Sequence, residues 1–234
     1  MTPAAGEALA AAEVIVGYQT YLDLIPEFLA GKEVIASQMM KEVDRCREAL
    51  ALASEGKTVA LVSGGDPGIY AMAGLVFELA REQGDFVAIE VIAGIAALNA
   101  CAARLGAPLM HDFAAISLSD LLTPWEKIEQ RLEAAAAADF VVVLYNPKSK
   151  KRAEHIVRAR EILLAHRLPE TPVGIVTAAT RETERIVLTT LEKMLESEIG
   201  MQTTVIVGNS MTFAWQGFMV TPRGYAAKYE LQGS

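Results

Sequence analysis

Short apolar runs with β-strand character alternate along this chain with stretches of helical periodicity. The apolar runs include residues 13–16, 34–36, 58–63, 86–92, 140–145 and 173–177. The helical patterns include residues 4–12, 21–29, 40–54, 69–83, 96–105, 125–138 and 151–166. Buried strands that alternate with amphipathic helices are typical of a mostly parallel sheet covered by helices. The sequence therefore predicts an α/β fold.

A break in this alternation divides the chain into two halves. Residues 106–124 begin with Gly-Ala-Pro and contain one strand-like run, at 113–118. We place a domain boundary there, which gives an N-terminal α/β domain at 1–112 and a C-terminal α/β domain at 113–234. Apolar runs at 186–188, 203–207 and 218–221 are expected to complete the second sheet.

Composition and charge exclude several classes of protein. The chain has 234 residues, 52% of them hydrophobic, and a formal net charge of −8, which argues against a nucleic-acid partner. No apolar run approaches the roughly 18 residues of a membrane span, and no signal peptide is visible, so we expect a cytoplasmic protein without a membrane partner. Cys46 and Cys101 lie in helical patterns and are expected in the core. The three histidines show no metal-ligand spacing, so no bound metal is expected.

The sharpest local motif is Ser-Gly-Gly-Asp-Pro-Gly-Ile-Tyr at residues 63–70, between an apolar run and a helical pattern. Asp66 is a suitable N-cap and Pro67 suits the first helical position. Gly64 and Gly65 allow another group to approach the backbone, and the N–H groups of a helix start favour an anion. A plain strand-to-helix turn is the alternative interpretation. The spacing fits neither a Walker loop nor a dinucleotide fingerprint.

This motif resembles the second glycine-rich loop of the tetrapyrrole methylases, a family of S-adenosylmethionine-dependent enzymes. Three further stretches match the family in order, namely Ala-Gly-Ile-Ala-Ala at 93–97, Leu-Tyr-Asn-Pro at 144–147 and Ile-Val-Thr-Ala-Ala-Thr at 175–180. Residues 106–113, 117–125 and 145–149 resemble the branch that methylates precorrin-3B at carbon 17, with ring contraction to precorrin-4. The resemblance covers nearly the whole chain.

The resemblance implies two α/β domains with a cleft between them that holds S-adenosylmethionine. It also implies a small-molecule tetrapyrrole substrate and a homodimer. Carried over position by position, the contacts to the cofactor fall on Gly64, Gly65, Asp66, Ile69, Ala96, Ala97, Asn146 and Ala179. Without the resemblance, ordinary helix packing would explain the two alanines at 96 and 97.

Ring contraction requires proton transfers, so acid–base residues are expected. The candidates are His111, Asp120 and Tyr70, with Asp112 beside His111 as a group that orients the imidazole ring. Histidine is the residue type best suited to proton transfer near neutral pH, which favours His111, but a hinge histidine is an equally good interpretation. Cations after the 140–145 strand are candidates for binding substrate carboxylates, and these are Lys148, Lys150, Lys151 and Arg152.

One departure from the family concerns the N-terminus. The family opens with a β-strand and a Gly-x-Gly-Pro-Gly loop, whereas this sequence begins Met-Thr-Pro and enters the 4–12 helix directly. We therefore expect the N-terminal sheet to lack one strand. Two alternatives stay open, namely a sister enzyme that acts on a cobalt-containing intermediate and a non-catalytic remnant.

Overall fold

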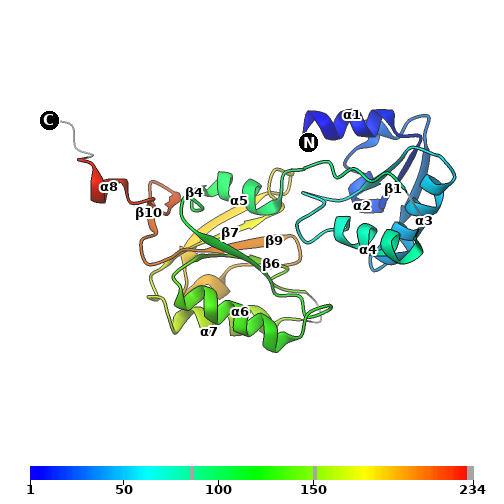
Figure 1. Cartoon of the computed structure of the whole chain (residues 1–234). Helices are drawn as coiled ribbons and strands as arrows, with labels where there is room; N and C mark the ends of the chain where they lie inside the picture. The colour runs from blue at the N-terminus through cyan, green and yellow to red at the C-terminus, as the bar shows by residue number, and fades with distance from the viewer. Residues whose placement is uncertain (85–86, 150–151, 231–234) are drawn as a thin grey trace. The chain divides into compact units, whose positions relative to one another are not determined.

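The computed structural model describes residues 1–84, 87–149 and 152–230. The chain folds into two compact units, Met1–Ala96 and Ala97–Ser234, each an assembly of helices and strands (Figure 1). The α/β expectation is confirmed. No helix in the described ranges has the length and apolar character that a bilayer span requires.

The first unit has three layers, with a parallel sheet between two layers of helices. The described strands of this sheet run in the order β2-β1-β3. Its elements are α1 (Pro3–Ala11), β1 (Val14–Tyr18), α2 (Gln19–Leu22), a 3-10 turn (Pro26–Phe28), β2 (Glu33–Ser37), α3 (Glu42–Ser54), β3 (Val59–Val62) and α4 (Ala73–Gln83). Because side chains alternate along a strand, Ile15 packs with α1 and α2, whereas Val14 and Val16 pack with α3.

Three expectations for this unit are wrong. The helix expected at 21–29 is broken into α2 and a 3-10 turn that begins at Pro26, a residue without the N–H that would continue the helix. The helix expected from residue 69 begins at Ala73. Phe86 lies outside the described residues, and the described remainder of the 86–92 strand pairs with no described strand, so it has no ladder.

The second unit contains a five-stranded sheet in the order β5-β6-β9-β7-β8. Its elements are α5 (Ala97–Leu105), β4 (Gly106–Ala107), β5 (Phe113–Ser117), α6 (Trp125–Ala137), β6 (Val141–Tyr145), α7 (Glu154–Leu164), β7 (Pro172–Thr177), β8 (Arg185–Thr190), a 3-10 turn (Met194–Glu196), β9 (Thr203–Val207), β10 (Phe213–Trp215), β11 (Phe218–Val220) and α8 (Tyr225–Lys228). Only β5 and β6 are parallel neighbours in this sheet, so the expectation of a mostly parallel sheet holds for the first unit and not for the second.

Helices cover both faces of this sheet, with α6 and α7 on one face and α5 on the other (Figure 1). Alternation along β7 decides which residue meets which layer. Val173 and Ile175 belong to the core beneath α6 and α7, whereas Gly174 faces Leu105 of α5. The first unit ends at Ala96 rather than at residue 112, because α5 packs on β7, β8 and β9 of the second sheet.

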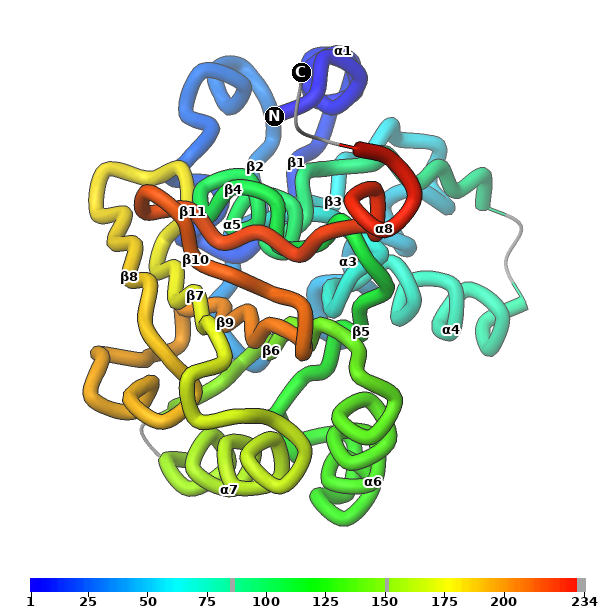
Figure 2. Tube along the Cα trace, turned by 90° about the vertical axis from the view of Figure 1, so that its left-hand side faces the viewer, coloured from blue at the N-terminus to red at the C-terminus, as the bar shows by residue number. Residues whose placement is uncertain are grey.

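A small third sheet, in the order β10-β11-β4, extends the second unit. Met219 and Val220 of β11 pair in parallel with Gly106 and Ala107 of β4, and the two segments lie side by side in Figure 2. The apolar run at 218–221 was expected in the larger sheet, and this expectation is wrong. Its pairing with β4 is a second reason why the residues after Ala96 belong to the second unit.

Both cysteines lie in the core, as expected. Cys46 and Cys101 are free thiols with 0% and 2% exposure. Burial raises the pKa of Cys46 to about 11. The positive charge of Arg45 opposes this shift, and the negative charge of Glu42 adds to it. Burial also raises the pKa of Cys101, although a hydrogen bond with Thr204 acts to lower it. Neither thiol is therefore a ready nucleophile.

The close packing of α5 on β7 gives a test of this arrangement. A Cβ atom at Gly174 would lie 2.2 Å from Cδ1 of Leu105, whose side chain is 1% exposed and has no room to move. We expect Gly174→Ala to lower the free energy of unfolding in urea by roughly 1–3 kcal/mol. Gly200→Ala is the matched control, because no atom lies within 4 Å of its added carbon. Equal stability of the two variants would contradict this packing.

Candidate functional site

The carboxyl ends of β5, β6 and β7 meet at one edge of the five-stranded sheet. β5 is parallel to β6, and β9 is antiparallel to both β6 and β7, so β5, β6 and β7 run in the same direction. The segments after these strands carry Asp120, Asn146 and Ala179. Ligands of open α/β sheets bind outside the carboxyl ends of the strands. The structure thus places three of the predicted site residues at the edge where a ligand is expected.

The backbone at this edge adopts a conformation that few residues tolerate. Asn146, Ala178 and Thr180 have φ angles of +50°, +50° and +65°. For residues with a Cβ atom this left-handed region costs roughly 1–2 kcal/mol each, and such strain concentrates at functional sites. The Asn146 amide donates to Ser117 Oγ at 3.0 Å, and the Ala178 N–H donates to the carbonyl of Gln202 at 3.0 Å. These bonds hold the strained loops in place.

Arg152 fastens the loop after β5 to the loop after β6. Its Nη1 donates to Ser119 Oγ at 2.8 Å, and its Nη2 donates to the carbonyl of Asn146 at 3.1 Å. Nη1 also lies 3.6 Å from Asp120 Oδ1, and the Arg152 side chain is only 15% exposed. Buried guanidinium groups of this kind fix loop geometry as well as charge.

Helix α5 is joined to the same edge at two points. The hydroxyl oxygen of Tyr145 accepts the Leu98 N–H at 2.8 Å, which places the predicted residue Ala97 beside the end of β6. At the other end of α5, Arg104 donates to Glu184, whose second oxygen accepts the Thr180 N–H at 2.6 Å. The hydrogen bond from Arg104, and then that from Thr180, lower the pKa of Glu184. The carboxylate therefore stays charged and holds both donors.

In the first unit, the glycine-rich loop packs on the segment before α5. Asp66 accepts the Gly68 N–H at 2.8 Å and the Gly94 N–H at 3.0 Å. Gly65 has a φ angle of +77°, and a Cβ atom at Gly94 would lie 1.9 Å from the Gly65 carbonyl oxygen. Asp66 was expected to cap the following helix, and this is wrong, because its carboxylate binds the two loops together and the helix begins later.

Other predicted residues of this loop have distinct surroundings. A Cβ atom at Gly64 would lie 2.7 Å from the ring of Tyr21, so the group that approaches this glycine belongs to the protein itself. Ile69 is 37% exposed and Ile95, in the adjoining loop, is 52% exposed. Ala96 is buried at 4% exposure. The linked loops therefore present backbone groups beside exposed apolar side chains.

Two predicted acid–base residues lie elsewhere. His111 precedes β5, and the carbonyl of its neighbour Asp112 accepts the Val141 N–H at the start of β6. His111 is therefore at the amino edge of the sheet, opposite Asp120. Its Nδ1 accepts the Asp112 backbone N–H at 2.8 Å, so the backbone rather than the Asp112 carboxylate makes the close contact. Tyr70 belongs to the first unit, has a φ angle of +53° and is 54% exposed.

The side chains predicted to bind substrate carboxylates differ in where the structure places them. Arg152 is fixed at the carboxyl edge, as described above, and Lys148 is exposed in the loop after β6. Lys150 and Lys151 lie outside the described residues. Sequence reasoning missed His155, which stands in the first turn of α7 and contacts the loop after β5. Its position at the start of the helix that follows the 140–145 strand is the signal in the sequence that points to it.

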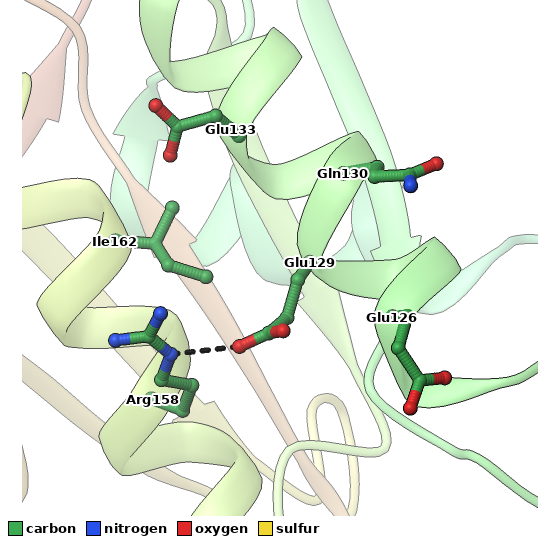
Figure 3. Close-up of a pocket in the computed structure, with 6 residues that line it drawn as sticks. All are labelled: Glu126, Glu129, Gln130, Glu133, Arg158 and Ile162. Atoms are coloured by element: carbon green, nitrogen blue, oxygen red, sulfur yellow. Dashed lines mark hydrogen bonds and ion pairs between the residues drawn. The ribbon is translucent and has the colours of Figure 1, made fainter.

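A surface hollow between α6 and α7 is distinct from this edge (Figure 3). Its lining consists of Glu126, Glu129, Gln130, Glu133, Arg158 and Ile162, all from these two helices. Arg158 Nε donates to Glu129 Oε1 at 2.7 Å across the hollow. The hollow contains carboxylates and an ion pair but no residue from a strand end, so it is a solvated helix surface.

Comparisons with known proteins agree with the sequence motifs. The family model described as "Tetrapyrrole (Corrin/Porphyrin) Methylases" matches residues 1–195. The chain is 54% identical to the "Cobalt-factor III methyltransferase" of Priestia megaterium over 99% of its own length, but it spans only 44% of that protein. It is 51% identical to the "Probable cobalt-factor III C(17)-methyltransferase" of Salmonella typhimurium, over 96% of this chain and 93% of that one.

A solved structure supports the same relationship. The crystal structure of the methyltransferase CobJ superposes with a TM-score of 0.90 and 38% sequence identity, over 95% of this chain and 93% of that chain. The chain belongs to the family of tetrapyrrole (corrin/porphyrin) methylases.

Proposed function

We propose that this protein transfers a methyl group from S-adenosylmethionine to carbon 17 of a tetrapyrrole in cobalamin biosynthesis. The likeness to the Salmonella typhimurium protein along nearly the full length of both chains carries this proposal. The gathering of Asp120, Asn146 and Ala179 at one sheet edge supports it. The sequence motifs favour precorrin-3B as the substrate, with ring contraction to precorrin-4, whereas the names of both curated relatives specify cobalt-factor III.

The predicted cofactor residues form two sets, one in each unit. Gly64, Gly65, Asp66, Ile69 and Ala96 belong to the two linked loops of the first unit, and Ala97, Asn146 and Ala179 belong to the carboxyl edge of the second sheet. Exposed Ile69 and Ile95 offer apolar surface, and the glycines offer backbone groups. When bound, S-adenosylmethionine would supply the electrophilic methyl group. The residues of this chain would orient the donor and the acceptor carbon for in-line transfer.

Methyl transfer to two substrates tests the proposed reaction. Methyl-labelled S-adenosylmethionine is incubated with the protein and with either precorrin-3B or cobalt-factor III, and the products are analysed by mass spectrometry and NMR. We expect one labelled methyl group at carbon 17 of at least one substrate, and the preferred substrate settles the metal requirement. Binding of S-adenosylhomocysteine without transfer to either tetrapyrrole would favour the non-catalytic alternative.

A substitution in the glycine-rich loop tests the cofactor site. Gly65 has a φ angle of +77°, so the bulky replacement Leu would strain the backbone as well as block a ligand. Asn tolerates this region and adds a side chain at smaller cost. We expect Gly65→Asn to weaken S-adenosylhomocysteine binding in calorimetry by at least about tenfold, or 1.4 kcal/mol.

Gly84→Asn is the matched control for this experiment. Gly84 ends α4 with a φ angle of +70°, and its added carbon would meet no atom within 4 Å. Undiminished affinity in Gly65→Asn would show that the loop is only a structural turn.

A further inference from the structure

Two basic side chains face Asp120 at the carboxyl edge, and neither makes a direct hydrogen bond to its carboxylate. Its Oδ1 lies 3.6 Å from Arg152 Nη1, and its Oδ2 lies 3.6 Å from His155 Nε2. Both separations exceed the 2.7–3.2 Å of a direct hydrogen bond. The Asp120 side chain is 47% exposed, whereas those of Arg152 and His155 are 15% and 17% exposed. The carboxylate thus keeps room to bind a further hydrogen-bond donor.

The imidazole ring of His155 is fixed in position and in tautomer. Its Nδ1 lies 2.9 Å from the carbonyl oxygen of Leu118. A carbonyl only accepts, so this contact assigns a proton to Nδ1 and leaves Nε2 as the nitrogen that gains or loses one. The ring stacks on Trp125 with the centroids 4.0 Å apart and an interplanar angle of 18°. His155 therefore presents Nε2 toward Asp120 in a single orientation.

The other two histidines do not combine a fixed Nδ1 proton with a carboxylate at the carboxyl edge. His111 is at the amino edge of the sheet, and its Nδ1 accepts a backbone N–H. His166 follows the opposite end of α7 from His155 and pairs through Nε2 with Glu133 Oε1 at 2.6 Å. Of the three histidines, His155 is the one that the structure places beside Asp120 at the carboxyl edge.

We infer that Asp120 and His155 form the acid–base pair that accepts a proton from the tetrapyrrole. This inference rests on the proposed function. In methyl transfer, an electron pair of the macrocycle forms the new carbon–carbon bond and the electron pair of the broken carbon–sulfur bond stays on sulfur. The methylated macrocycle then carries one extra positive charge, which it loses with an N–H or C–H proton.

That proton passes to Nε2 of His155, directly or through Asp120. The neutral imidazole becomes an imidazolium beside the Asp120 carboxylate, so the pair changes from one negative charge to none. The ion pair stabilises the protonated ring. Arg152 acts as a positioning residue, because it holds Asp120 and the backbone of Asn146 in one cluster without offering a group that exchanges a proton.

His155→Asn tests the pair, since an Asn side chain can still donate to the Leu118 carbonyl but has no group in the place of Nε2. We expect turnover to fall by about 10²–10⁴-fold with unchanged affinity for S-adenosylhomocysteine. The matched control is His166→Asn, which removes the His–carboxylate pair with Glu133 and should keep the wild-type rate. In His155→Ala, free imidazole should restore part of the lost rate, which a purely structural role would not allow.

Several results would overturn the inference. One is a wild-type rate in His155→Asn. Another is a lost rate in His155→Ala that imidazole does not restore. If the wild-type protein itself transfers no methyl group, the proposed function fails, and ¹⁵N NMR of the histidine rings decides on the pair alone. The pair predicts that Asp120→Asn moves the Nε2 signal of His155 and leaves those of His111 and His166 in place. An unmoved His155 signal would overturn it.

Discussion

The common direction of β5, β6 and β7 brings three loops to one edge of the second sheet. Strand direction alone would leave these loops free to move, and Arg152 removes much of that freedom by binding Ser119 in one loop and the Asn146 carbonyl in the next. Asp120 and His155 take their places from the same loops and from the helix that follows. The geometry of the candidate site therefore depends on a nearly buried guanidinium rather than on the apolar core.

The two edges of this sheet use buried arginine in different ways. At the amino edge, the 3%-exposed side chain of Arg167 donates to the carbonyls of Ala136 and Phe140 and pairs with Asp139. Burial lowers the pKa of Arg167, against the opposing charge of Asp139. Asp139 also accepts two hydrogen bonds from Ser210, so its carboxylate is fully engaged. At the carboxyl edge, Asp120 instead lies 3.6 Å from both Arg152 and His155. The first edge therefore holds its carboxylate by direct hydrogen bonds, and the second by longer contacts.

Much of the fold could be predicted from local sequence. The runs that became β6 and β9 are continuous stretches of apolar residues, and such stretches form buried strands wherever helices cover both faces. The start of α4 could not be predicted, because Asp66 binds Gly94, a residue far along the chain, instead of the nearest helix N–H groups. The 86–92 run has strand composition, but a strand exists only with a neighbour, and composition does not supply one.

The candidate site was predicted in part, because only some of its residues are placed by local sequence. Asn146 and Ala179 follow apolar runs directly, so strand direction places them at one edge. His111 shares its residue type with His155, but it precedes a strand while His155 follows one, and only the fold separates these two cases. The pairing of Asp120 with His155 joins the loop after β5 to the first turn of α7, and the two are distant in sequence. Residue spacing in the sequence does not predict this pair, because the pair depends on the register between β5 and β6.

The claim that the carboxyl edge of the second sheet binds the cofactor is tested most directly by backbone amide NMR during titration with S-adenosylhomocysteine. The structure predicts shifts for the amide signals of Leu98, Asn146 and Ala179 at that edge. It predicts unchanged signals for Asp139 and Ser210 at the amino edge, where Ser210 N–H already binds the Asp139 carboxylate. Shifts at Asp139 and Ser210 without shifts at Asn146 and Ala179 would contradict the account.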